Sequence, residues 1–247
     1  MPAVALLLVT VLVVALAAGG VAAIAGFGIG SLLTPLLALS YGTKVAVLLV
    51  ALPHFAATVL RAWMLRSHVE RRVLLTFGAA SAVGGLGGAL LHATFGSRIL
   101  SVVLGLLLIF TGVSGLAGLS ARFRISGAPW AFAAGILSGG FGGVVGNQGG
   151  IRTAALLHFP LDRLQLVATA TAIGVVVDLA RIPVYLATGG AEILANWPVV
   201  IVAGIGVIAG TLLFTPLLRR VPEPIFRRAV YILVALLGLA FLLGLTG

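Results

Sequence analysis

Long apolar stretches dominate the chain and limit what it can fold into. Six runs of mainly apolar residues reach roughly 20 residues, the length that a helix needs to cross a bilayer: 43–65, 73–95, 99–119, 161–187, 197–219 and 225–246. Of the 247 residues, 61% are hydrophobic and only 8% are charged. A soluble domain of this length could not hide so much apolar surface from water. The sequence therefore predicts an all-α polytopic membrane protein embedded in a lipid bilayer.

Two further apolar segments, 3–40 and 128–159, are interrupted by glycine-rich stretches. The first is broken at Gly26–Gly30, and the second at Gly142–Gly143 and again at Gly146–Gly150. Glycine permits sharp bends, and unwound backbone at membrane depth is tolerated where protein or a wet cavity satisfies its polar groups. We expect each segment to form two helical arms joined by unwound backbone, which gives eight hydrophobic segments in total.

Basic residues predict which side of the membrane each loop occupies. The chain has 15 Lys+Arg against five Asp+Glu, a formal charge of +10, and cytoplasmic loops of membrane proteins collect Arg and Lys. We therefore assign this charge to topology and not to nucleic-acid binding, and place loops 66–72, 122–124 and 219–228 in the cytoplasm. Twelve of the 15 basic residues then lie on or near the cytoplasmic side, the exceptions being Lys44, Arg98 and Arg181.

The same assignment decides how the two broken segments sit in the bilayer. An odd number of crossings must separate the cytoplasmic Arg124 from the external Glu192, and 161–187 supplies one. Segment 128–159 is therefore expected to enter and leave on one side as a re-entrant hairpin, and the first broken segment to do the same. Because its first arm, Val4–Ala25, is long enough to cross alone, an arrangement with eight spans stays open. No Lys or Arg precedes this arm, so we expect it to be retained and not cleaved as a secretory signal.

The two halves of the chain, 1–121 and 126–247, resemble each other within a single membrane domain. Each half is one hairpin followed by three crossings, and an odd number of crossings inverts the second copy. Inverted repeats with broken helices are typical of secondary transporters, whose site lies where the breaks meet. The matching positions are Gly26-Phe27-Gly28 with Gly140-Phe141-Gly142, Arg61 with Arg181 at an offset of about 120, and Gly84 and Gly88 with Gly206 and Gly210 at an offset of 122.

The half-helix that follows each break is a candidate anion site. Its first backbone N–H groups lack partners, and the positive end of the helix dipole favours negative charge there. We expect these half-helices to start at Ser31 and Ile151. The candidate substrate-binding residues are Gly28, Gly30, Ser31, Thr34, Asn147, Gln148, Gly149, Gly150, Arg152 and Thr171.

Each of these residue types also has a structural interpretation. The glycines would serve close helix packing. Asn147 and Gln148, an adjacent amide pair in an apolar segment, would satisfy the hairpin backbone, since such groups are costly in lipid unless they are paired. Arg152 would be a topological charge. Sequence alone leaves both sets of roles open.

The run 161–187 carries a polar stripe at helical spacing. Steps of three and four place five residues on one face: Thr171, Gly174, Asp178, Arg181 and Tyr185. An intramembrane carboxylate indicates a functional site, and Asp178 either forms a structural pair with Arg181 or carries a coupling proton. The equivalent face of the first half holds Ala51, His54, Thr58, Arg61 and Leu65. His54 is an alternative proton carrier or a helix–helix hydrogen-bond donor.

Several functional classes are excluded by what the sequence lacks. It has no cysteine, which removes disulfides, iron–sulfur clusters and thiolate chemistry. No Ser–His–Asp or HExxH arrangement is present, and His68, His92 and His158 have no metal-like partner. The glycines at 26, 28 and 30 lack the βαβ unit of a dinucleotide site. We therefore expect no enzymatic activity, no cofactor and no metal site.

The glycine loops and the polar stripe together resemble the TauE/SafE family of sulfite-exporter-like permeases. The stretch Ala25–Leu33 is similar to the first family loop, Gly139–Gly143 to the second, and Ala168–Thr171 with the stripe that follows to the second-half helix. The resemblance implies transport of a small sulfur-containing anion such as sulfite, sulfoacetate or thiosulfate. It also implies a location in the inner (cytoplasmic) membrane and coupling to the proton gradient.

The leading hypothesis is therefore a proton-coupled secondary transporter for a small oxyanion. A passive anion channel of the same architecture and a non-transport membrane partner subunit are the alternatives. The GxxxG-like glycines suit packing within one chain or a homodimer face. Sequence leaves the anion, the direction of transport and the oligomeric state open.

Overall fold

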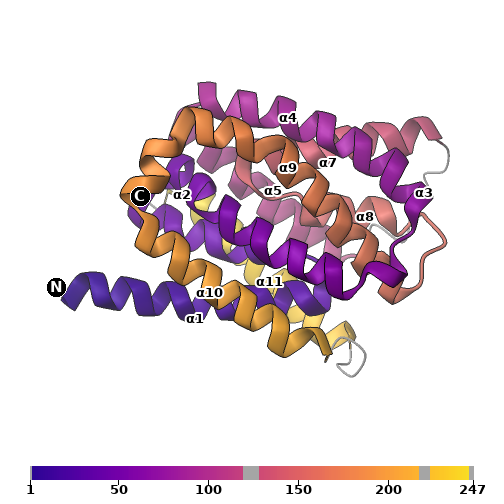
Figure 1. Ribbon diagram of the computed structural model, residues 1–247, viewed down its shortest axis with the longest axis horizontal. Coiled ribbons are helices and arrows are strands. Elements are labelled where there is room, and N and C mark those ends of the chain that lie inside the picture. Colours follow the sequence, from indigo (N-terminus) through magenta and orange to yellow (C-terminus); the bar gives the residue numbers. More distant parts are fainter. Residues whose placement is uncertain (1, 119–127, 217–222, 245–247) are drawn as a thin grey trace.

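The computed structural model is helical throughout and describes residues 2–118, 128–216 and 223–244 (Figure 1), with no strand among them. A 3-10 turn (Arg66–His68) and a π-helical turn (Leu74–Gly78) connect α2 to α4. The α-helices are α1 (Pro2–Ala25), α2 (Ile29–Met64), α3 (Arg71–Val73), α4 (Ala79–Thr94), α5 (Ser97–Leu116), α7 (Ala128–Val145), α8 (Gly149–Leu156), α9 (Arg163–Ala195), α10 (Trp197–Phe214) and α11 (Glu223–Leu242).

The lengths and surfaces of these helices identify a multi-pass membrane protein. Six described helical stretches are long and apolar enough to cross a bilayer: Val4–Ala25, Ile29–Met64, Arg71–Thr94, Ser97–Leu116, Arg163–Ala195 and Trp197–Phe214. Five of them contain most of a run expected from the sequence, and the sixth is the first arm of the first broken segment. Large apolar side chains such as Leu6, Val83 and Ile205 are exposed on the outer surface, as lipid-facing positions are.

Both broken segments are interrupted where the two halves were expected to unwind. The first break, Gly26–Gly28, separates α1 from α2, and the second break, Gly146–Gln148, separates α7 from α8. Gly26 and Gly146 have φ angles of 80° and 69°, which glycine adopts without steric cost. Each also donates its N–H to the carbonyl four residues back, at 3.0 Å, in the manner of a helix C-terminus closed by a left-handed residue. The two breaks therefore begin in the same way, 120 residues apart, but end differently: Gly28 has a φ of 139° and Gln148 one of −120°.

The additional break expected at Gly142–Gly143 is wrong, because α7 runs without interruption to Val145. Glycines here allow α4 to approach closely: a Cβ on Gly143 would collide with the backbone carbonyl of Gly85. The counterpart of Gly26-Phe27-Gly28 is accordingly Gly146-Asn147-Gln148, not Gly140-Phe141-Gly142. The half-helices also start two residues earlier than expected, at Ile29 and Gly149.

Helices of the first half of the chain pack in pairs with helices of the second half. Helix α4 packs along α7 and α1 along α10, on opposite sides of α2 and α9, while α5 packs along α11 (Figure 1). Glycines make the two outer contacts close. A Cβ on Gly84 would meet the carbonyl oxygen of Ile136 and the nitrogen of Gly140, and a Cβ on Gly210 would meet those of Leu16 and Gly20. Gly84 therefore lies against α7 in the same way that Gly210 lies against α1, whereas the sequence offset of 122 matched Gly84 with Gly206.

The second part of α2 and helix α9 form an antiparallel pair at the centre of the molecule. Helix α2 is kinked at Gly42, and α9 at Gly189, where the side chain of Leu48 fits against the glycine. The two helices run side by side from Leu48 and Gly189 to Arg61 and Thr171. At about 1.5 Å per residue this contact is roughly 20 Å long, and the polar faces of α2 and α9 meet along it. All five stripe residues of α9 are buried, which confirms the face predicted from their spacing.

Candidate functional site

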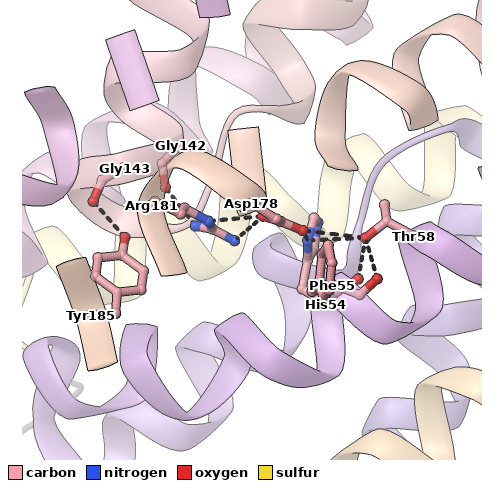
Figure 2. A network of polar contacts seen from close by, with 8 residues as sticks. All are labelled: His54, Phe55, Thr58, Gly142, Gly143, Asp178, Arg181 and Tyr185. Carbon is pink, nitrogen blue, oxygen red and sulfur yellow. Dashed lines mark hydrogen bonds and ion pairs between the residues drawn. The ribbon is translucent and has the colours of Figure 1, made fainter. Parts of the chain in front are cut away.

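Asp178 lies at the centre of a buried polar network between α2 and α9 (Figure 2). Its Oδ1 accepts hydrogen bonds from Nε and Nη2 of Arg181, both at 2.8 Å. Its Oδ2 lies 2.6 Å from Nδ1 of His54 and accepts from Oγ1 of Thr58 at 3.3 Å. The carboxylate has no solvent exposure, and burial of a charge is tolerated when it is paired and hydrogen-bonded. The pairing with Arg181 proposed from the sequence is therefore present, and His54 joins it from the other half of the chain.

Arg181 also ties this network to the second break. Its Nη1 donates to the carbonyl oxygen of Gly142 at 2.6 Å, so the guanidinium bridges α7 and Asp178 (Figure 2). The last turn of a helix has carbonyl groups without partners inside the helix. Two more side chains satisfy this turn of α7: Tyr185 donates to the Gly143 carbonyl at 2.5 Å, and Nδ1 of His92 lies 2.8 Å from the Val144 carbonyl. Side chains thus hold the end of α7 in place.

The two breaks meet, as the repeat predicted. Ser31 Oγ donates to Asn147 Oδ1 at 3.1 Å, and a Cβ on Gly30 would collide with the carbonyl of Gly146. Gly149 packs against Phe27 in the same region. Glycine at positions 30 and 149 is therefore required by the close approach of one break to the other.

Arg61 and Arg152 approach neighbouring turns of α9 and are almost completely buried, with 1% and 2% of their surface exposed. Arg61 Nε donates to Thr171 Oγ1 at 2.9 Å, and its Nη1 has no partner. Nε and Nη1 of Arg152 both lack partners. A Cβ on Gly174 would lie 3.3 Å from Arg152 Nη1, so this guanidinium occupies the space that the glycine leaves. Two guanidinium groups thus reach one face of α9 with unused donors.

These two arginines are buried inside the protein, which their assignment to the cytoplasmic side of the membrane did not indicate. Both were counted among the basic residues on or near the cytoplasmic side, and Arg61 was not a candidate site residue. Its alignment with Arg181, and its place on the face of His54 and Thr58, were the available signals. Tertiary packing accounts for the burial, because α2 and α8, which carry Arg61 and Arg152, pack against α9.

The cluster carries more positive than negative charge. Three buried guanidinium groups, those of Arg61, Arg152 and Arg181, stand against one buried carboxylate, an excess of two positive charges when His54 is neutral. Arg152 lies close enough for its charge to act on both Arg61 and His54. Unpaired buried charges are costly unless a ligand or counter-ion balances them.

Other candidate residues add unpartnered donors or serve packing. The Asn147 Nδ2 atom, both amide atoms of Gln148, and the hydroxyls of Thr34 and Thr153 are buried without partners. Gly28 caps the start of α2 with φ 139°, and Gly150 packs against Thr111. Thr171 is engaged by Arg61 and donates to the Val167 carbonyl at 2.7 Å. Gly28 and Gly150 therefore have a packing role, while the two amides and Thr34 keep buried polar atoms without partners at or near the breaks.

Two apolar clusters border the polar groups along α2 and α9. The first includes Leu65, Phe77, Leu156, Leu166 and Val167. The second includes Val47, Leu48, Ala89, Tyr185 and Ile193. Because α2 and α9 are antiparallel, the first cluster lies toward the Arg61–Thr171 end of the polar face and the second toward the Leu48–Gly189 end. Buried apolar side chains therefore pack around the polar groups of the helix pair.

Metal-binding geometry is not found in the described part of the chain. Within residues 2–118, 128–216 and 223–244, no group of three or more His, Asp or Glu side chains is placed to hold an ion. The groups of Arg61 and Arg152 that lack partners are hydrogen-bond donors, the chemistry that suits an oxyanion.

Comparison with known proteins yields one match. The family model described as "Sulfite exporter TauE/SafE" matches residues 11–241, which span both breaks and reach from α1 into α11. No curated protein and no solved structure matches the chain.

Proposed function

The chain belongs to the TauE/SafE sulfite exporter family, and from this premise we propose that it is a secondary transporter, not an enzyme. Its substrate is a small sulfur-containing anion such as sulfite, sulfoacetate or thiosulfate, and it works in the cytoplasmic membrane. The observation that carries the proposal is the pair of buried guanidinium groups, Arg61 and Arg152: Nη1 of Arg61 and both Nε and Nη1 of Arg152 have no protein partner. An oxyanion supplies the acceptors and the negative charge that these groups need.

The apolar packing around the polar groups favours a carrier that works by alternating access over a passive channel. Buried apolar side chains of two clusters, with Phe77 and Leu156 in one and Val47 and Leu48 in the other, pack around the polar groups of α2 and α9, whereas a conducting channel needs a continuous polar path. In the proposed cycle each apolar cluster opens in turn, so that the anion site faces one side of the membrane at a time. The meeting of two broken helices at the site supports the same mechanism.

The proposed architecture is a pair of inverted repeats, each with a re-entrant hairpin and three crossings. Reversal of the chain at each break supports the hairpins: Gly28 packs against Val21 and Ala22, and Gln148 against Gly142. The reciprocal packing of α1 on α10 and of α7 on α4 supports the repeat. Three crossings per half then turn the second copy over, which places the starts of α2 and α8 against each other from opposite sides.

Proton coupling is proposed to act through His54, Asp178 and Arg181. These three side chains form one chain of contacts, and Arg181 extends it to Gly142 at the end of α7. Uptake of a proton by Asp178 weakens its attraction for Arg181. Arg181 is then free to rearrange, and the second break, which it holds, changes with it.

Proteoliposomes containing the purified protein test the proposal. Thiosulfate, labelled with sulfur-35, should accumulate against its gradient when a pH gradient is imposed, and liposomes without protein provide the baseline. Asp178→Asn separates a carrier from a channel. A proton-coupled carrier should lose uphill accumulation in this variant, whereas a channel should retain its downhill flux. Folded protein that moves no sulfur oxyanion at any pH would contradict the proposal and favour a partner subunit.

A further inference from the structure

The charges buried around α9 also indicate how many negative charges the anionic ligand carries. Among the described residues, Asp178 is the only buried carboxylate. Glu70 and Asp162 use their side chains to cap the starts of α3 and α9, and Glu192 is exposed. Asp178 can therefore balance one guanidinium group of the cluster, and none of the acidic side chains at Glu70, Asp162 and Glu192 adds to it.

Arg181 is the arginine that Asp178 balances. Two of its nitrogens bond to the carboxylate, and a third bonds to the Gly142 carbonyl, so its donors are committed to the protein. Arg61 makes one bond, to the neutral hydroxyl of Thr171. Arg152 makes contact with the Gly174 backbone region and with no acceptor at Nε or Nη1.

Arg61 and Arg152 converge on α9 from two different helices. Arg61 comes from α2 and meets α9 at Thr171, and Arg152 comes from α8 and meets it at Gly174, one turn away. The groups that face them from α2 and α9 are His54, Thr58 and Asp178, of which Asp178 is already paired. A ligand between the two arginines therefore supplies the balancing charge that Asp178, bonded to Arg181, leaves unmet.

We propose that this site selects divalent over monovalent oxyanions, because it buries the three guanidinium groups of Arg61, Arg152 and Arg181, and the one buried carboxylate among the described residues, that of Asp178, is bonded to Arg181. The inference rests on the proposed function and specifies the charge of its substrate. A monovalent anion leaves one positive charge buried and uncompensated, whereas a divalent anion leaves none. Guanidinium groups present paired N–H donors to oxyanions, so two arginines can hold both charges of one small ligand.

Thiosulfate and methanesulfonate provide a matched test of valence. Both carry one sulfonate group and are similar in size, but thiosulfate has two negative charges and methanesulfonate has one. Equilibrium dialysis of sulfur-35 thiosulfate against the purified protein in detergent, at fixed ionic strength and pH, measures its affinity, and competition measures that of methanesulfonate. We expect thiosulfate to bind at least about tenfold more tightly.

The outcomes separate this inference from the proposed function. Equal affinity for the two anions would overturn the valence preference and leave anion transport standing. Binding of neither anion by folded protein would contradict both. Adding sodium chloride at matched ionic strength in place of methanesulfonate gives the baseline for screening by salt.

Single charge removals sharpen the test. Arg152→Gln removes one of the two unbalanced charges, so thiosulfate should lose at least about tenfold in affinity while methanesulfonate changes little, and the preference should shrink. Arg61→Gln should act in the same direction. Arg152→Lys keeps the charge and should keep the preference even where affinity falls, because only the paired donor geometry is lost.

The matched control is Arg98→Gln, which removes one charge from an exposed position at the start of α5. It should leave both affinities unchanged. Size-exclusion elution and helical circular dichroism establish that each variant is folded. A folded Arg152→Gln and a folded Arg61→Gln that both retain the full preference for thiosulfate would overturn the inference.

Discussion

The two breaks begin with the same glycine conformation but differ in their surroundings. Gly26 and Gly146 have the same left-handed conformation and the same hydrogen bond to the preceding turn. Beyond them, the first break continues with Phe27, whose ring stacks on Tyr231 with centroids 5.7 Å apart. The second continues with Asn147 and Gln148, whose amides contact polar groups and Gly142. One break is packed by an aromatic ring, and the other presents polar atoms.

The arginines at corresponding positions differ in the same way. Arg181 belongs to the second half and holds the end of α7 and Asp178. Its counterpart Arg61 bonds to Thr171 across the molecule and keeps an unused donor. Arg181 therefore anchors the second break, whereas Arg61 keeps the free donor that we propose binds the ligand. Four substitutions test this division, the largest expected effect first.

Arg181→Gln should cause the largest loss of stability. It leaves the Asp178 carboxylate buried without its guanidinium partner, and breaking a buried pair in this way costs about 3–5 kcal/mol. We expect a large fall in the melting temperature in detergent and poor recovery of monodisperse protein. A variant as stable as the parent would show that Arg181 does not anchor the second break.

Arg61→Gln should have the opposite profile, with transport lost and the fold retained. Arg61 contributes one neutral hydrogen bond and an unbalanced charge, so its removal should change the melting temperature little. Loss of a guanidinium group from a charged ligand costs about 2 kcal/mol or more, which predicts at least about a 30-fold fall in thiosulfate flux into proteoliposomes. A fall in stability equal to that of Arg181→Gln would remove the distinction between the two arginines.

Gly30→Ala should disturb the contact between the breaks. The added methyl group would collide with the Gly146 carbonyl, and overpacking of this kind costs about 1–3 kcal/mol. Thermal unfolding in detergent and thiosulfate flux should both decrease. Gly87→Ala is the matched control, because a Cβ at Gly87 meets nothing within 4 Å, and this variant should behave like the parent.

Tyr185→Phe should have the smallest effect of the four. It removes one hydroxyl that donates to the Gly143 carbonyl and keeps the ring, so the expected loss is about 1 kcal/mol. The melting temperature should fall by a few degrees, with flux lowered less than in Arg61→Gln. No change would mean that Arg181 and the helix end suffice to hold the second break without this bond.

How far the sequence predicts the site depends on the kind of signal each residue carries. The stripe from Thr171 to Tyr185 was predicted because helical spacing alone places its members on one face. The break at Gly142–Gly143 was predicted wrongly, since a pair of glycines serves close helix packing as readily as unwinding. Only the position of α4 against α7 distinguishes the two uses.

Arg61 and Arg152 show the same limit for charged residues. Both lie near the ends of apolar runs, where the statistics of basic residues favour the cytoplasmic surface. Their burial follows from the packing of α8 and of the second part of α2 against α9. Those helices are far apart in sequence, and no local pattern records that they meet.

Composition and periodicity alone determined that this chain is a helical membrane protein with two glycine breaks and a polar stripe, because lipid requires apolar helices and helical geometry makes residue spacing readable. The tertiary structure alone decided which glycines unwind, which arginines are buried, and that Asp178 is shared by His54 and Arg181. These depend on contacts between helices from different halves, whose energies arise only when the helices pack.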